Sequence, residues 1–112
     1  MMKYLVVATG GPGFASPEEA LEVLQDVILP GFKELISLEK RKRIIAGGLP
    51  VGERAFVFIA DAKSNDDLDQ MLRKLSLWGE FEWEVTALQT FSGRARQERQ
   101  AVRELKKNIR NR

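Results

Sequence analysis

One segment, residues 54–60, constrains the fold more than any other, because it predicts a strand that is apolar on both faces. It is a run of aromatic, β-branched and small apolar residues with one charge at its start. The side chains of a strand alternate between the two faces of its sheet. Both alternating sets are apolar here: Ala55, Val57 and Ile59 against Phe56 and Phe58. Such a strand belongs in the interior of a sheet with both faces covered.

Turn signals and helical spacing place the elements that precede this strand. Residues 3–9 predict a strand that ends at a glycine-rich turn. Ser16 is an N-cap residue, and apolar side chains recur at helical spacing after it. We expect Pro30 and Gly31 to kink or break this helix, because proline has no amide proton and clashes with the preceding turn. A second helical segment is expected over 32–40.

The remaining elements follow from the same signals. A short strand is expected over 42–47, with a glycine-rich hairpin loop over 47–52. Ser64 caps a helix whose apolar residues fall on one face at i, i+3, i+4 and i+7: Leu68, Met71, Leu72 and Leu75. The last strand is expected over about 81–91, and a helix over about 92–108.

The predicted order is strand, helix, strand, strand, helix, strand, with one helix appended. This order is typical of the ferredoxin-like split βαβ arrangement, an α+β fold in which two helices cover one face of a four-stranded antiparallel sheet. Residues 1–91 form that domain. Residues 92–112 form a basic C-terminal helix or arm, because they hold 8 Lys and Arg against 2 Asp and Glu. The domain itself holds 10 Lys and Arg against 14 Asp and Glu.

The chain contains neither cysteine nor histidine. This composition excludes disulfides, a zinc ribbon, a thiol nucleophile and the side chain best suited to proton transfer near neutral pH. We therefore expect no cofactor and no metal, with any chemistry carried by carboxylates, Lys, Arg, hydroxyl groups or the single Tyr4. No apolar run approaches the roughly 18 residues of a membrane helix, and the apolar N-terminal stretch is short for a signal peptide. We expect a cytoplasmic protein.

Two helices leave one face of the sheet open, and the last strand indicates what lies on it. Its aromatic side is expected under the helices: Phe81, Trp83 and Val85. Its polar side is expected on the open face: Glu82, Glu84 and Thr86. One apolar set of the 54–60 strand joins the two carboxylates there, and a contiguous apolar patch marks an interface or a binding groove. We expect a second copy to close over this face, sheet to sheet, which makes the protein a homodimer or a higher homo-oligomer with an enclosed cavity.

Residues from about 44 to 92 resemble the second half of the muconolactone delta-isomerase family. The resemblance is carried by 45–47, by 56–61, by the helix with its apolar face at 68–75, and by 77–88. The resemblance implies a dimeric α+β barrel and cofactor-free chemistry on a small organic acid or lactone, in which a proton moves next to a carbonyl. This chain differs from the family in having no histidine. Where the family has an Arg before Ala-Gly, this chain has Ile44, with Arg43 one position earlier.

The candidate catalytic residues are Glu84 and Glu82, which lie two apart and so share one face of the strand. In a closed apolar cavity, desolvation and mutual repulsion raise a carboxyl pKa, which makes a glutamate a proton shuttle near neutral pH. The position of Glu84 matches the Glu-Val-Thr of the family that the chain resembles. The candidate substrate-binding residues supply a hydroxyl group, two guanidinium groups and apolar walls: Tyr4, Arg43, Arg54, Phe56 and Phe58.

A structural interpretation stands beside each of these candidates: the two glutamates keep a solvated face soluble, Tyr4 packs in the core with its hydroxyl group satisfied, and the two arginines are solvated at strand ends. Other functions also stand beside this one. The same scaffold can serve as a non-catalytic ligand-binding or interaction module. Residues 54–61 partly match the third-strand signature of ribonucleoprotein-type RNA-binding domains, but Glu82 and Glu84 on that sheet face oppose phosphate binding. Nucleic acid is therefore not expected as a partner. The C-terminal helix can bind nucleic acid or an acidic membrane, or its narrow apolar stripe can pack on a neighbouring subunit and cover a cavity mouth, and we favour the subunit.

Overall fold

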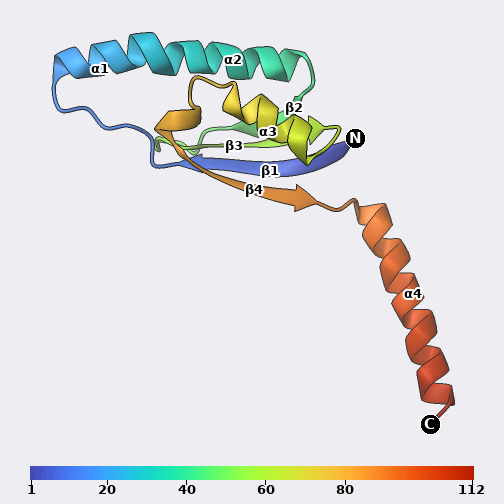
Figure 1. The fold of residues 1–112 in the computed structure, drawn as a ribbon. Coiled ribbons are helices and arrows are strands. Elements are labelled where there is room, and N and C mark those ends of the chain that lie inside the picture. Colours follow the sequence, from blue (N-terminus) through green and yellow to red (C-terminus); the bar gives the residue numbers. More distant parts are fainter.

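The computed structural model describes all 112 residues, and it consists of one sheet, a layer of helices on one of its faces, and a long helix that leaves the body (Figure 1). The sheet has four antiparallel strands in the order β2-β3-β1-β4. The strands are β1 (Met2–Thr9), β2 (Ile44–Gly48), β3 (Phe56–Ala62) and β4 (Glu82–Leu88). The expected α+β ferredoxin-like architecture is confirmed, with the doubly apolar strand β3 inside the sheet.

The kink or break that was expected at Pro30 does not occur. Helix α1 (Pro17–Val23) and helix α2 (Leu29–Lys40) are joined by η1 (Leu24–Ile28), which is a π-helical turn. All three run on as one rod across the sheet in Figure 1. A π turn widens the helix and shifts its hydrogen bonds to i→i+5, so the missing amide proton and the ring of Pro30 are accommodated just after it.

The second half of the chain follows the expected order with shifted boundaries. Helix α3 (Asn65–Arg73) begins as expected at Ser64, whose side chain accepts from the Asp67 backbone N–H. The 3₁₀ turn η2 (Trp78–Glu80) leads into β4, which ends at Leu88 rather than near residue 91. Helix α4 (Phe91–Arg110) begins one residue before the expected start, and its cap is Thr90, whose side chain accepts from the Gly93 backbone N–H.

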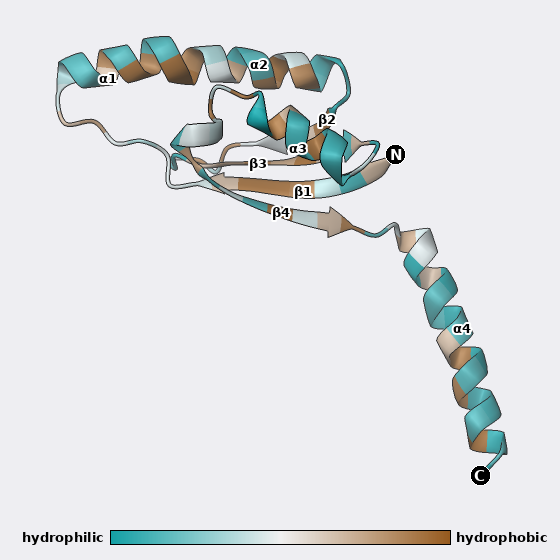
Figure 2. Ribbon diagram, in the orientation of Figure 1, coloured by the Kyte–Doolittle hydropathy of each residue, from teal (hydrophilic) through white to brown (hydrophobic).

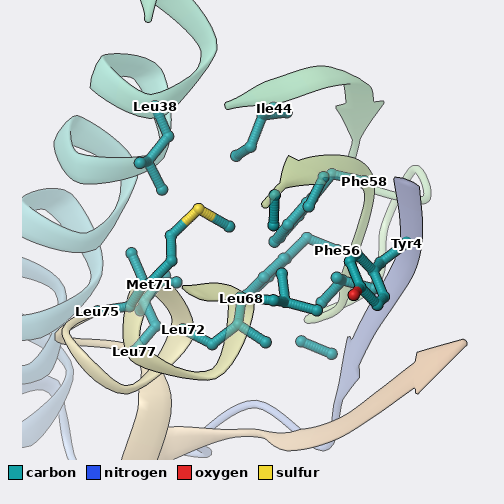
Figure 3. Packing of buried hydrophobic residues seen from close by; sticks show 14 residues of the cluster. Tyr4, Leu38, Ile44, Phe56, Phe58, Leu68, Met71, Leu72, Leu75 and Leu77 are labelled. Carbon is teal, nitrogen blue, oxygen red and sulfur yellow. The ribbon is translucent and has the colours of Figure 1, made fainter. Parts of the chain in front are cut away.

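The hydrophobic core lies between the sheet and the helices (Figure 3). The sheet contributes alternate residues of β1 and β3, including Val6 and Phe58, and α3 contributes Leu68 and Leu72. Leu77, in the turn after α3, is fully buried. The expected apolar face of α3 is therefore the face that packs on the sheet, as its period predicts.

Helix α4 lies apart from both layers and extends the molecule to 73 Å in its longest dimension, against 27 and 22 Å in the others. It is mostly hydrophilic with a few apolar bands (Figure 2). No helix of the chain combines the length and the apolar character needed to cross a bilayer.

Gly31 is the point where α2 touches the turn after α3. A Cβ atom built on Gly31 would overlap the side chain of Leu77, which has no room to move. The glycine that was expected to break the helix instead lets α2 lie close to the rest of the core. This contact sets how closely α2 packs against the turn after α3.

We expect Gly31→Ala to lower the free energy of unfolding by about 1–3 kcal/mol, the usual cost of overpacking a core. The cost should exceed the roughly 1 kcal/mol by which alanine favours a helix over glycine. Urea denaturation followed by circular dichroism measures the difference. Gly79→Ala is the matched control, because a Cβ at Gly79 meets no atom within 4 Å. Equal stability of the two variants would contradict the tight contact.

Candidate functional site

The register of the sheet decides which apolar set of β3 faces the helices. Phe56 and Phe58 are buried in the core, whereas Val57 and Ile59 alternate with them on the open face. On β1, Val7 pairs with Val57 and Leu5 pairs with Ile59. Side chains of directly paired residues lie on the same face, so these four form an apolar patch in the middle of the open face.

Glu84 and Glu82 lie on the open face, as the alternation of β4 predicted. Glu84 pairs with Val7 and therefore stands beside the apolar patch, while Glu82 pairs with Thr9 at the end of β1. Both side chains are exposed to solvent in the single chain. On the other side of β4, Trp83 is half-buried, and its indole N–H donates to the Trp78 carbonyl oxygen at 2.9 Å. Val85 faces the helical side but is 42% exposed, because no helix reaches over this edge.

Tyr4 lies in the core, on the helix side of the sheet, and is only 2% exposed. Its hydroxyl group donates to Asn65 Oδ1 at 2.5 Å, at the start of α3. Of the two interpretations of Tyr4, packing in the core and supply of a hydroxyl group to a cavity, this position favours packing, because β1 alternates and Tyr4 falls on the helix side of the sheet. Its hydroxyl instead ties β1 to α3, which is the structural role common for strand aromatics.

An apolar pocket lies between the helical rod and the β2–β3 edge of the sheet. It consists of two adjoining hollows of about 260 Å³ and 250 Å³. Both are walled by Phe32 of α2, Leu49 of the hairpin loop and Phe56 of β3. Phe58 lines the first hollow, and Phe81 lines the second. A mostly apolar hollow with a few polar groups is the usual form of a small-molecule site.

Arg54 is the one basic residue that lines this pocket. Its guanidinium lies over the ring of Phe14, with 4.3 Å to the ring centroid, and it donates to the Pro12 carbonyl oxygen. The Arg54 carbonyl oxygen accepts from the Gly11 backbone N–H at 3.2 Å. The loop after β1 therefore holds the guanidinium in place at the rim of the pocket.

Gly11 makes this clamp possible, because a Cβ there would lie 2.7 Å from Phe81 Cε1 and 2.9 Å from the Arg54 carbonyl oxygen. No larger residue could bring the loop so close to both groups. The glycine-rich turn after the first strand, which the sequence identified only as a turn, thus positions the charged group of the pocket.

Two carboxylates that sequence reasoning missed also line the pocket. Glu39 of α2 lines the first hollow, and Glu53 of the hairpin loop lines the second, next in sequence to Arg54. Both side chains are exposed, so they stand at the rim. The only signal in the sequence is the acid–base pair Glu53-Arg54 directly before a buried strand, and such pairs are common at strand ends.

Arg43 lies elsewhere, in a groove of about 590 Å³ between α2 and α3. Its guanidinium pairs with Asp67 at 3.0 Å and donates to the Asp61 carbonyl oxygen at 3.2 Å. Asp67 also accepts from the Lys63 backbone N–H at 2.9 Å. The expected carboxylate-binding groups are thus separated: Arg54 lines the apolar pocket, and Arg43 is engaged in a contact between β2, β3 and α3.

The residues predicted for the site divide among three places. Arg54, Phe56 and Phe58 come together at the apolar pocket, Glu82 and Glu84 stand on the opposite face of the sheet, and Tyr4 and Arg43 serve contacts of the body. No group of three or more Asp and Glu side chains lies close enough together to hold a metal ion.

Comparisons with known proteins give the same fold. Sequence searches match no family model and no curated protein. Among solved structures, muconolactone isomerase is similar over 80% of this chain and 90% of its own, with a TM-score of 0.64 and 18% identity. The 5-chloro-2-hydroxyhydroquinone dehydrochlorinase TftG of Burkholderia phenoliruptrix AC1100, solved with 2,5-dihydroxybenzoquinone, is similar over 81% and 97%, with a TM-score of 0.60 and 19% identity. The resemblance inferred from residues 56–88 is confirmed at the level of the fold.

The contact at Asp67 gives a pH-dependent prediction. The hydrogen bond from the Lys63 backbone, together with the charge of Arg43, holds the pKa of Asp67 below its ordinary value. Because the folded pKa is the lower one, Asp67 stabilises the fold above the unfolded pKa of about 3.9 and stops doing so as the pH falls through the folded pKa. Asp67→Asn should therefore be less stable than the natural chain near neutral pH, and this difference should shrink in acid.

Denaturation midpoints measured between about pH 7 and about pH 2 test this dependence, because the range spans the ordinary aspartate pKa. Asp66→Asn is the control, since Asp66 is an exposed neighbour in the same first turn of α3. A stability difference between Asp67→Asn and the natural chain that stays constant with pH would show that the stabilisation by Asp67 does not depend on the charge of its carboxylate.

Proposed function

We propose that this chain is a cofactor-free enzyme that isomerises, or otherwise moves a proton on, a small oxygenated organic acid or lactone. The observation that carries the proposal is the apolar pocket beneath the helical rod with one anchored guanidinium, that of Arg54, at its rim. The two similar structures are enzymes whose names refer to a lactone and to a hydroxylated ring. Their likeness to this chain is one of fold, and the chemistry is our proposal.

The pocket suits a planar molecule with one acidic end. Its aromatic walls, Phe32, Phe56 and Phe81, favour a flat apolar body, while the guanidinium favours a carboxylate or an enolate oxygen. Because Arg54 is already stacked on Phe14 and bonded to Pro12, little conformational entropy is lost when it binds an anion. Specificity for an acid would therefore come from one preorganised cation rather than from several flexible ones.

Proton transfer requires a base close to the bound molecule, and Glu53 is the carboxylate that shares a hollow with Arg54. In the proposed step, the Glu53 carboxylate takes a proton from a carbon next to the carbonyl group, and the C–H electron pair moves into an enolate. Arg54 stabilises the negative charge on the enolate oxygen. The same carboxyl group returns the proton to another carbon, so the double bond moves and no atom is gained or lost.

Glu84 and Glu82 belong to a second arrangement that we also propose, in which two copies pack their open faces together. The apolar patch of Leu5, Val7, Val57 and Ile59 needs a cover, and Glu84 stands at its edge. A second copy would bury this patch and enclose the carboxylates of both chains. In that dimer, Glu84 is the alternative base for a substrate held between the sheets.

A non-catalytic role in ligand binding is the second candidate, and one observation favours it. The two carboxylates of the pocket lining are exposed at the rim rather than aimed into an enclosed space. A pocket of this kind can hold an acid without altering it. Turnover of a bound compound separates the two functions, whereas binding alone does not.

We expect Arg54→Gln to weaken binding of 2,5-dihydroxybenzoquinone, an acidic enol, by about 10- to 100-fold, because a hydrogen bond to a charged group contributes about 1.5–3 kcal/mol. Tryptophan fluorescence is a suitable readout, since Trp83 stacks edge-on against Phe56 of the pocket at 5.3 Å. Arg41→Gln is the matched control, because Arg41 is an exposed arginine that lines the separate groove between α2 and α3 and neither hollow of the pocket. If both variants bind equally well, Arg54 is not the acid-binding group.

Muconolactone isomerisation, followed by nuclear magnetic resonance in deuterated water, tests the identity of the base. Loss of isomerisation and of deuterium incorporation in Glu53→Gln, with Glu84→Gln unaffected, would support the pocket as the catalytic site. The reverse pattern would place the chemistry between the two sheets. Binding without turnover in the natural chain, for muconolactone and for related lactones, would leave the ligand-binding function as the better account.

A further inference from the structure

Helix α4 presents a stripe of large apolar side chains to water. Val102, Leu105 and Ile109 recur at i, i+3 and i+7, so they share one face of the helix, and they are 49%, 60% and 60% exposed. Phe91, at the start of the helix, is 97% exposed. At 1.5 Å per residue, the 20-residue helix is about 30 Å long, and it rests on neither layer of its own chain (Figure 1).

Such a helix needs a partner surface. Helices in proteins owe most of their stability to the packing of an apolar face, and isolated helices are marginal in water. The partner must also suit the charge of this segment, which holds eight basic and two acidic residues over 92–112. Four of the basic residues line one hollow near the end of α4: Arg103, Lys106, Lys107 and Arg110. The surface that α4 fits is therefore apolar and acidic.

The exposed surface formed by α1, η1 and the first residue of α2 (the α1–η1 surface) has these two properties. Leu21, Leu24 and Leu29 are 65%, 43% and 63% exposed there. Residues 17–28 contain four carboxylates and no Lys or Arg: Glu18, Glu19, Glu22 and Asp26. The two surfaces thus match in both apolar character and charge, and each lacks a cover in the single chain.

If α4 docks on the α1–η1 surface, that surface belongs to a different copy of the chain. Only Gln89 and Thr90 join β4 to α4, and Thr90 is fixed as the N-cap of the helix. In Figure 1, α4 runs away from the end of β4, whereas α1 lies at the far end of the helical layer. Pairing of α4 with α4 of another copy is disfavoured, because it would bring two sets of basic side chains together.

We infer that α4 of one copy packs on the α1–η1 surface of a second copy. This seat adjoins the apolar pocket, because Leu24 and Ile28 of η1 line its second hollow. The seated helix would cover the rim of the pocket and bring basic side chains to a rim that otherwise holds Glu39, Glu53 and Arg54. This last consequence rests on the proposed function, since added positive charge favours an acidic substrate. The docking itself requires no ligand.

A paramagnetic label tests the docking directly, because the natural chain has no cysteine. The Leu105→Cys variant carries a nitroxide on its cysteine and is unenriched. It is mixed with the natural chain, which has no nitroxide and is enriched in ¹⁵N. Every resonance that broadens then belongs to a different copy from the one that carries the nitroxide. We expect the amide resonances of residues 17–29 to broaden. They should not broaden when the nitroxide is attached through Lys63→Cys, because Lys63 is an exposed residue before α3, away from α4.

Each other pattern would overturn the inference. Broadening confined to α4 would indicate pairing between two α4 helices, and broadening of β1 and β3 would indicate docking on the open face of the sheet. No broadening would mean that α4 folds back on its own chain or stays free. A chain that remains monomeric, and whose α4 binds phosphatidylglycerol vesicles, would identify an anionic membrane as the partner.

A charge exchange provides an independent test of the same contact. Lys106→Glu with Arg110→Glu should raise the dissociation constant of the assembly at least tenfold, measured by sedimentation, and so should Glu18→Lys with Glu22→Lys. The combination of all four changes should recover most of the loss, because the charges are then exchanged across one contact. Gln100→Glu with Asn111→Asp, on the side of α4 opposite its apolar stripe, is the control. Additive losses without recovery would contradict the contact, whether or not the pocket binds any acid.

Discussion

The aromatic cluster around Phe56 is the contact on which the rest of the structure depends. The ring of Phe56 is stacked with Phe58 at 6.2 Å and meets Phe81 and Trp83 edge-on at 5.0 and 5.3 Å. It joins an interior strand to the edge strand β4 and to the turn before it. The same side chain walls both hollows of the pocket. Phe56 therefore contributes both to the stability of the fold and to the pocket, and a substitution of Phe56 would affect both.

The pocket exists because α1, η1 and α2 form one continuous helical rod. The π turn before Pro30 keeps α1 and α2 in line, so Ile28 and Phe32 extend over the sheet edge as one continuous wall. Gly31 then lets the rod approach Leu77 on its other side. A true break at Pro30 would have turned α1 away and opened the second hollow to solvent. The irregular hydrogen bonding of η1 thus has a clear consequence for the site.

Three apolar surfaces remain without cover in the single chain, namely the open face of the sheet, the α1–η1 surface and the stripe of α4, and they differ in charge. The open face of the sheet is apolar in its middle, with carboxylates on its edge strand, while α4 is apolar along one stripe and basic elsewhere. The division of charge along the sequence, acidic over 1–91 and basic over 92–112, is therefore a division between a body and an arm. Of these surfaces only α4 is basic, so its charge favours pairing with the acidic α1–η1 surface of another copy over pairing of two α4 helices.

The sequence by itself determined the order of the elements, the interior position of β3, the apolar face of α3 and the open-face position of Glu82 and Glu84. These are consequences of period, capping and turn chemistry, which act over a few neighbouring residues. The sequence also placed Arg54 and Phe56 among the binding residues, although without the pocket that joins them.

Tertiary structure alone decided which apolar set of β3 faces the helices, because two apolar faces give the alternation no preferred side. It decided that Tyr4 bonds to Asn65 and that Arg43 bonds to Asp67, since both partners come from distant parts of the chain. It also brought Glu53 to the rim of the pocket. Contacts between segments far apart in sequence leave no local pattern, and the pocket consists almost wholly of such contacts.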